Sequence, residues 1–171
     1  MSLFSRLFGR NKKPSGIRKP DIDLLLSSRD VNNSIIELDN YICELCAWGE
    51  ETDKLSAPQM TFYLNQNLER EINNGGFHQY FWNSTGDFAL ETVSSLQSIS
   101  AVKTAELLLK AIDRFPGKTV PGNIVQRQHL LEQIEAKTTE AWQELDDAFY
   151  EYDEDLNALN MEYIRTHRNH F

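Results

Sequence analysis

The spacing of apolar side chains is the feature that most constrains the fold of this chain. From Asp21 onward, apolar residues recur three and four positions apart, as they do along one face of an amphipathic helix. The alternation that marks a half-buried strand is absent. Ser56 and Gln59 have capping-box spacing, with Pro58 where the first helical turn tolerates it. The pattern predicts an all-α, single-domain helical bundle of about six to eight helices.

Charge divides the chain into a short basic arm and a long acidic domain. Residues 1–20 contain six basic groups and no acidic one, and we expect them to form a flexible arm. The alternative is a weak contact of residues 1–20 with an anionic membrane surface. Residues 21–171 hold all 26 acidic groups against 11 basic ones, a net charge of −15 in a chain whose total is −9. Direct nucleic acid binding is therefore not expected, because that affinity comes from Lys and Arg.

The remaining composition argues against several classes of site. No apolar run approaches the roughly 18 residues of a membrane-spanning helix. Cys43 and Cys46 have C-x-x-C spacing without the second pair of a zinc site, so we expect buried, unreactive thiols in a reducing, cytoplasmic setting. The histidines form no metal-binding pattern, and His167 and His170 lie at a C-terminus that we expect to fray. We expect no catalytic residue, no metal and no cofactor.

An unusual segment, residues 73–87, combines glycines, aromatic side chains and amides. Phe77, Tyr80 and Phe81 are spaced so that one helical turn can direct all three toward a core. The glycines before them are expected to end the preceding helix, with Gly75 in a left-handed cap. Two interpretations stay open, a structural junction that docks two helices or a pocket whose polar side chains bind a ligand. The residues concerned are Asn74, Gly75, Gly76, Phe77, His78, Gln79, Tyr80, Phe81, Asn83, Gly86 and Asp87.

A second unusual segment is strongly acidic and contains no basic residue. Five carboxylates, from Glu140 to Glu154, are spaced four, three, four and three positions apart, which predicts one stripe on a helix. Their spacing along the axis is about 5 Å, against about 3.4 Å between charges on one DNA strand. The stripe is either a partner-binding surface or a solvated face. The candidate partner-binding acids are Glu140, Glu144, Asp146, Asp147, Glu151, Asp153, Glu154 and Asp155.

The first of these segments also carries a resemblance to a known family. The resemblance rests on the sequence Asn74-Gly75-Gly76-Phe77-x-Gln79-Tyr80-Phe81-x-Asn83-Ser84-x-Gly86-Asp87. This sequence closely resembles the signature of the DNA-mimic family, small acidic helical bacterial proteins of the nineteen-kilodalton type. The resemblance implies an all-α fold, often a homodimer, without catalytic activity. It also implies an acidic surface that occupies the DNA-binding face of a helix-turn-helix repressor and so regulates transcription.

Three functional hypotheses follow. The leading one is a non-enzymatic DNA mimic that binds a basic DNA-binding protein, such as a helix-turn-helix transcription regulator. The second is an immunity-type inhibitor of a toxic enzyme. The third is a small-molecule-binding or hydrolytic protein that uses His78, Gln79, Asp87 and perhaps Glu71. A cleft lined by the first three of these residues would favour the third hypothesis, whereas packed side chains beside exposed carboxylates would favour the other two.

Overall fold

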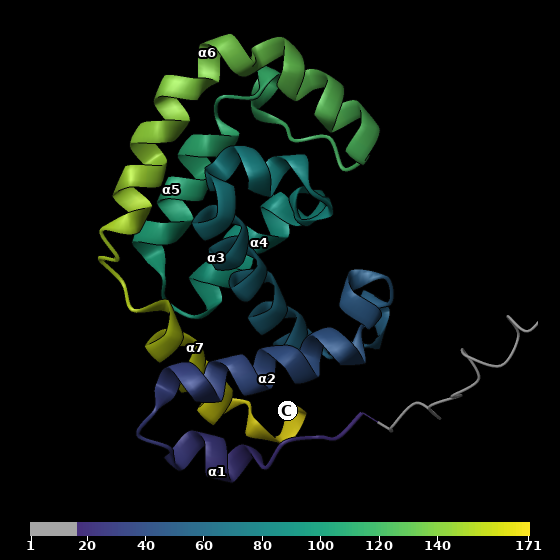
Figure 1. The fold of residues 1–171 in the computed structure, drawn as a ribbon, viewed down its shortest axis with the longest axis vertical. Helices are drawn as coiled ribbons and strands as arrows, with labels where there is room; N and C mark the ends of the chain where they lie inside the picture. The colour runs from purple at the N-terminus through teal and green to yellow at the C-terminus, as the bar shows by residue number, and fades with distance from the viewer. Residues whose placement is uncertain (1–16) are drawn as a thin grey trace, which may run out of the picture.

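The computed structural model describes residues 17–171, and within that range the protein is all-helical, as predicted. Figure 1 shows the seven α-helices in one compact arrangement. Residues 1–16, most of the predicted basic arm, lie outside the described range, and so does most of the proposed membrane contact. No helix in the described range combines the length and apolar character that crossing a bilayer requires. The helices are α1 (Ile22–Ser27), α2 (Val31–Leu45), α3 (Ala57–Trp82), α4 (Ala89–Ser98), α5 (Val102–Ile112), α6 (Ile124–Tyr150) and α7 (Leu156–Thr166).

Polar residues begin most of these helices. The Ser56 hydroxyl accepts a hydrogen bond from the Gln59 backbone N–H, while the Gln59 side chain accepts one from the Ser56 N–H. The capping box predicted for α3 is therefore confirmed. The Asp30 side chain accepts a hydrogen bond from the first turn of α2, and the Asn123 side chain accepts one from the first turn of α6. Each cap satisfies a backbone N–H that has no partner within its own helix.

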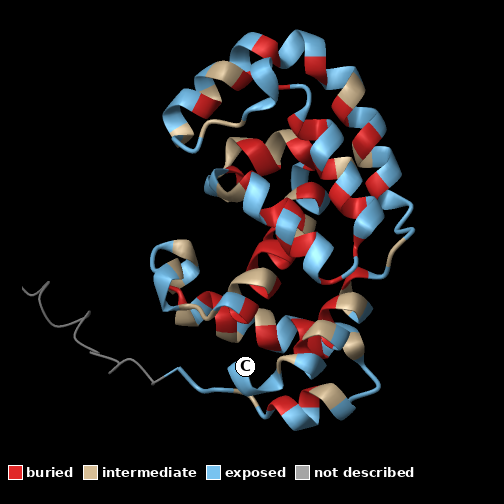
Figure 2. Ribbon diagram, turned by 180° about the vertical axis from the view of Figure 1, so that it is seen from behind, coloured by how far each residue is buried: buried red, intermediate tan, exposed pale blue. Residues whose placement is uncertain are grey.

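Two hydrophobic clusters make up the core, and α3 contributes to both. The first lies where α1, α2, α7 and the start of α3 meet, and it buries Phe62 and Cys43. The second lies among the rest of α3, α4, α5 and α6. Figure 2 shows the buried residues following α3 through the molecule. Burial raises the pKa of the Cys43 thiol to about 12, which agrees with the prediction of an unreactive cysteine.

The C-terminus is ordered, contrary to the sequence-based expectation. Phe171 is buried and its ring packs edge-on against Phe62, with ring centroids 6.1 Å apart. The expectation of fraying was wrong because a single terminal aromatic side chain can bury enough apolar surface to hold the last turn in place.

Helix α3 is interrupted at the glycine pair but does not end there. Gly75 has a φ of −174°, which is extended backbone, whereas Gly76 has a φ of +70° and a ψ of −171°. The left-handed residue is therefore Gly76, and the prediction that placed Gly75 in that conformation was wrong. Helical structure resumes at Phe77 and continues to Trp82. The glycine pair changes the direction of the chain between two helical pieces.

Helix α6 is long, curved and shorter at its C-terminus than predicted. The Thr138 and Thr139 hydroxyls donate to the carbonyls of Ile134 and Glu135, a contact that bends helices, and Figure 1 shows the curve. The last helical residue is Tyr150, and Tyr152 follows with a φ of +48°. Glu154 therefore lies beyond the helix, and its predicted place in the helical stripe was wrong.

Candidate functional site

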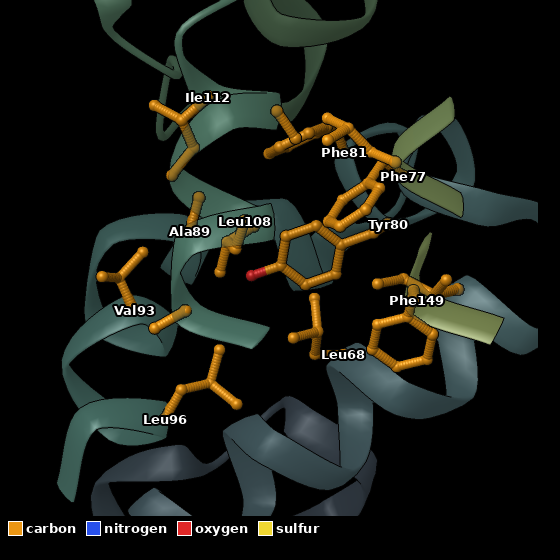
Figure 3. Packing of buried hydrophobic residues seen from close by; sticks show 14 of the residues in the cluster. Leu68, Phe77, Tyr80, Phe81, Ala89, Val93, Leu96, Leu108, Ile112 and Phe149 are labelled. Carbon is orange, nitrogen blue, oxygen red and sulfur yellow. The ribbon is translucent and has the colours of Figure 1, made fainter. Parts of the chain in front are cut away.

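The aromatic residues of the 73–87 segment form a structural junction. Phe77, Tyr80 and Phe81 are all buried, as predicted, and Figure 3 shows them among the side chains of the second cluster. The centroid of the Phe81 ring lies 4.9 Å from that of the Phe115 ring and 5.4 Å from that of the Trp142 ring. These contacts join α3 to the end of α5 and to α6, so the segment docks three helices.

A buried arginine that the sequence analysis missed holds the end of this junction. Arg127 of α6 has no exposed surface. Its guanidinium donates to the carbonyls of Phe81, Asn83 and Pro121 at 2.6, 2.8 and 2.7 Å, and one nitrogen lies 2.6 Å from a carboxylate oxygen of Asp87. Buried charges need this number of partners to offset their lost hydration. Asp87 is thus occupied as the partner of a structural arginine.

Gly86 belongs to the same arrangement. A Cβ at this residue would lie 2.8 Å from Nε of Arg127 and 2.9 Å from the Phe81 carbonyl oxygen. Only a residue without a side chain lets the guanidinium reach the end of α3.

The polar residues of the segment do not meet in one cleft. Glu71 accepts hydrogen bonds from the side-chain amides of Gln79 and Asn83, both at 2.8 Å. His78 and Gln79 line an open hollow between α3 and α6, and Asp87 lines a different hollow beside α4. The predicted pocket of His78, Gln79 and Asp87 is therefore not formed, because Asp87 turns toward Arg127. Asn74 is exposed next to the glycine pair.

Asp146 connects the acidic segment to the glycine pair. It projects from α6, and its carboxylate accepts a hydrogen bond from the Phe77 backbone N–H at 2.8 Å. Burial raises the pKa of Asp146, although this hydrogen bond partly lowers it. Gly76 makes room for the carboxylate, since a Cβ there would lie 2.1 Å from Oδ2 of Asp146. Asp146 caps the second piece of α3, so its inclusion among the outward-facing acids needs correction.

Further contacts fix how α6 is rotated against α3. The Tyr150 hydroxyl donates to the Ile72 carbonyl at 2.8 Å, and the Tyr152 hydroxyl exchanges hydrogen bonds with the Asn73 side chain. Together with Asp146, these contacts hold the C-terminal half of α6 in one orientation.

The three acids after α6 also have partners within the protein. Glu154 accepts hydrogen bonds from the backbone N–H groups of Lys103 and Thr104 and from the Thr104 hydroxyl, and so caps α5. Desolvation alone would raise the pKa of Glu154, but these hydrogen bonds outweigh it and lower that pKa. Asp153 pairs with the Lys103 ammonium at 3.0 Å, and Asp155 caps α7. The structure therefore does not place these three acids in one free surface.

Four candidate acids remain exposed, three on the outer face of α6 and one, Glu151, at its C-cap. Glu140, Glu144, Asp147 and Glu151 are all exposed, and together they are called the exposed stripe below. Figure 2 shows α6 along the edge of the molecule with an exposed outer face. Within the described residues no lysine or arginine forms an ion pair with them, and Asp147 accepts one hydrogen bond, from the Gln143 amide.

A family model described as DMP19-like protein matches residues 53–167, about two-thirds of the chain. The chain belongs to the DMP19-like family. The matched region contains α3 to α7, and with them the aromatic junction and the exposed stripe of this DMP19-like protein. The curated proteins and the solved structures contain no match to the chain. Within residues 17–171, no group of three or more His, Cys, Asp or Glu side chains is arranged to hold a metal ion.

Proposed function

We propose that this DMP19-like protein is a non-enzymatic DNA mimic, which occupies the DNA-binding face of a basic protein such as a helix-turn-helix regulator. The observation that carries the proposal is the exposed stripe. Three of its carboxylates stand on one face of α6 and the fourth, that of Glu151, continues the row at the C-cap of the helix. No lysine or arginine occurs between Lys137 and Arg165. A protein that binds DNA presents Lys and Arg side chains to a row of phosphates, and the stripe offers those side chains a row of carboxylates.

The dimensions of the stripe suit this role. From Glu140 to Glu151 the helix rises about 16 Å, so that successive carboxylates are about 5 Å apart along the axis. Their positions fall within an arc of about 60° around the helix, given 3.6 residues per turn. A recognition surface that contacts consecutive phosphates of one strand would meet several of these charges at once.

The stripe is energetically unfavourable for an isolated helix. Like charges three or four residues apart destabilise a helix by about 0.2–0.5 kcal/mol per pair. Glu140 and Glu144, Glu144 and Asp147, and Asp147 and Glu151 are three such pairs. A face with interspersed acidic and basic side chains would also be solvated, without this cost. An uncompensated acidic row is therefore better explained by a basic partner than by solvation alone.

The test uses two triple variants of the full chain. The first, Glu144→Gln with Asp147→Asn and Glu151→Gln, removes three charges from the exposed stripe and keeps the side-chain shapes. The control, Glu37→Gln with Glu44→Gln and Glu91→Gln, removes three exposed charges from α2 and α4. Partners are captured from native cell extract on each protein, and the affinity of a captured partner is then measured at low and high salt.

We expect the wild type and the control to capture a basic DNA-binding protein that releases its DNA when they are added. The stripe variant should bind at least about tenfold more weakly at low salt, and the difference should shrink as salt screens the charges. Circular dichroism should show equal helix content in all three. Equal affinity of the two triple variants for the partner would refute the proposal at this surface.

A further inference from the structure

The hollow between α3 and α6 has a chemistry that the exposed stripe does not share. It has a volume of about 450 Å³ and is lined by His78, Gln79, Trp82, Glu132 and Glu135. Two of these residues are aromatic, two are carboxylates, and none is a lysine or an arginine. The lining therefore combines negative charge with π-faces, which are the two features that attract an organic cation.

The aromatic side of the hollow is held in place by stacking. The His78 and Trp82 rings lie nearly parallel, at 18°, with centroids 5.7 Å apart. The His78 ring also lies edge-on to the buried Trp142, with ring centroids 6.2 Å apart. The Trp142 indole N–H in turn donates to the Ala111 carbonyl at 3.2 Å. His78 thus contacts two indoles, and one of them, Trp82, also lines the hollow.

The carboxylates stand on α6 near a hydrogen bond that joins this helix to the end of α3. The Gln128 side chain on α6 donates to the Trp82 carbonyl at 3.0 Å. Glu132 and Glu135 follow Gln128 by four and seven positions, so they stand on the same face of α6, and both line the hollow. Within the described residues neither carboxylate lies within ion-pair distance of a lysine or an arginine, and His129 Nδ1 lies 3.8 Å from Oε2 of Glu132. Both carboxylates are therefore available to a ligand.

We propose that this hollow binds a guanidinium group, with its plane against the aromatic side and its N–H groups donating to Glu132 and Glu135. A guanidinium is favoured over an ammonium because it is planar, stacks on aromatic rings and presents several N–H groups in a fixed fork. The group can belong to a free small molecule or to an arginine side chain of a protein. The site lies on the N-terminal half of α6, outside the exposed stripe, and the proposal does not depend on the mimic function.

The experiment follows the indole N–H signal of Trp82 by NMR in the full chain during titration. The probes are agmatine, a blocked pentapeptide with one arginine, and the same peptide with citrulline, in which a neutral urea replaces the guanidinium. The site variant is Glu132→Gln with Glu135→Gln. The control variant is Glu144→Gln with Asp147→Asn, which removes two charges from the exposed stripe on the same helix.

We expect saturable shifts of the Trp82 signal with at least one guanidinium probe and none with the citrulline peptide. The site variant should bind about tenfold more weakly, as expected for the loss of two partly exposed ion pairs, and the control should bind as the wild type does. Stronger binding of the arginine peptide assigns the natural source to a protein, and equal or stronger binding of agmatine assigns it to a small molecule. Equal binding of the citrulline peptide, an equal loss in both variants, or no saturable shift overturns the proposal.

Discussion

Substituting Gly76 by alanine should destabilise the protein through two separable effects. The first is backbone strain, because φ +70° with ψ −171° is a conformation that essentially only glycine adopts, at a cost of about 1–3 kcal/mol for other residues. The second is displacement of Asp146, since the new Cβ would lie 2.1 Å from its Oδ2. The hydrogen bond from the Phe77 N–H would then be lost, at about 0.5–1.5 kcal/mol. Together, the two effects should lower the free energy of unfolding by about 1.5–4.5 kcal/mol.

Gly117→Ala is a control for a positive φ without a steric overlap. Gly117 also has a positive φ, +65°, but no atom lies within 4 Å of the position its Cβ would take. Substituting Gly117 by alanine should lower the free energy of unfolding by only about 1–2 kcal/mol. Urea unfolding followed by circular dichroism gives both values. If Gly76→Ala costs no more than Gly117→Ala, Asp146 does not need the space that Gly76 provides, and the reasoning fails. The double variant Gly76→Ala with Asp146→Ala should cost less than the sum of the two single changes, because the overlap is absent.

Two further changes test the buried arginine and the cap on α5. Arg127→Met should lower the free energy of unfolding by about 3 kcal/mol or more, because it leaves three carbonyls without a donor. Urea unfolding measures this change, and a decrease below about 1 kcal/mol would contradict the assigned network. Glu154→Gln should melt below the wild type at pH 7, where the caps on Lys103 and Thr104 are charge-assisted. Folding lowers the pKa of Glu154, so the wild type loses this stability advantage as the pH falls below the ordinary value of 4.5. The melting temperatures of the wild type and the variant should therefore converge in acid. A difference between them that widens in acid would exclude the assigned cap.

Local signals in the sequence predicted much of this fold. Helical periodicity and the Ser56 box depend on residues a few positions apart, and each was confirmed. The burial of Phe77 and Phe81 followed from their spacing on one helical turn. These features are local, so a single sequence contains the information that determines them.

The errors concern side chains whose partners are distant in the sequence. Asp146 lies next to Asp147, and only the glycine pair 70 positions earlier decides that one turns inward and the other outward. Glu154 leaves the helical stripe because α5 presents N–H groups that need an acceptor. Arg127 had a signal that could have been used: it stands four residues before Leu131, in register with the buried stripe of α6. A charged residue in register with an apolar stripe is a candidate for a buried, fully hydrogen-bonded group.

The acids of the segment from 140 to 155 divide into those that the fold needs and those that it does not. Asp146, Glu154 and Asp155 each receive a backbone N–H, so a change of residue type there weakens a helix start. The exposed stripe receives none, and its positions can change without loss of structure. Descendants of this protein can therefore alter the pattern of surface charge while keeping one scaffold. That freedom allows the electrostatic surface along α6 to diverge through substitutions confined to four codons.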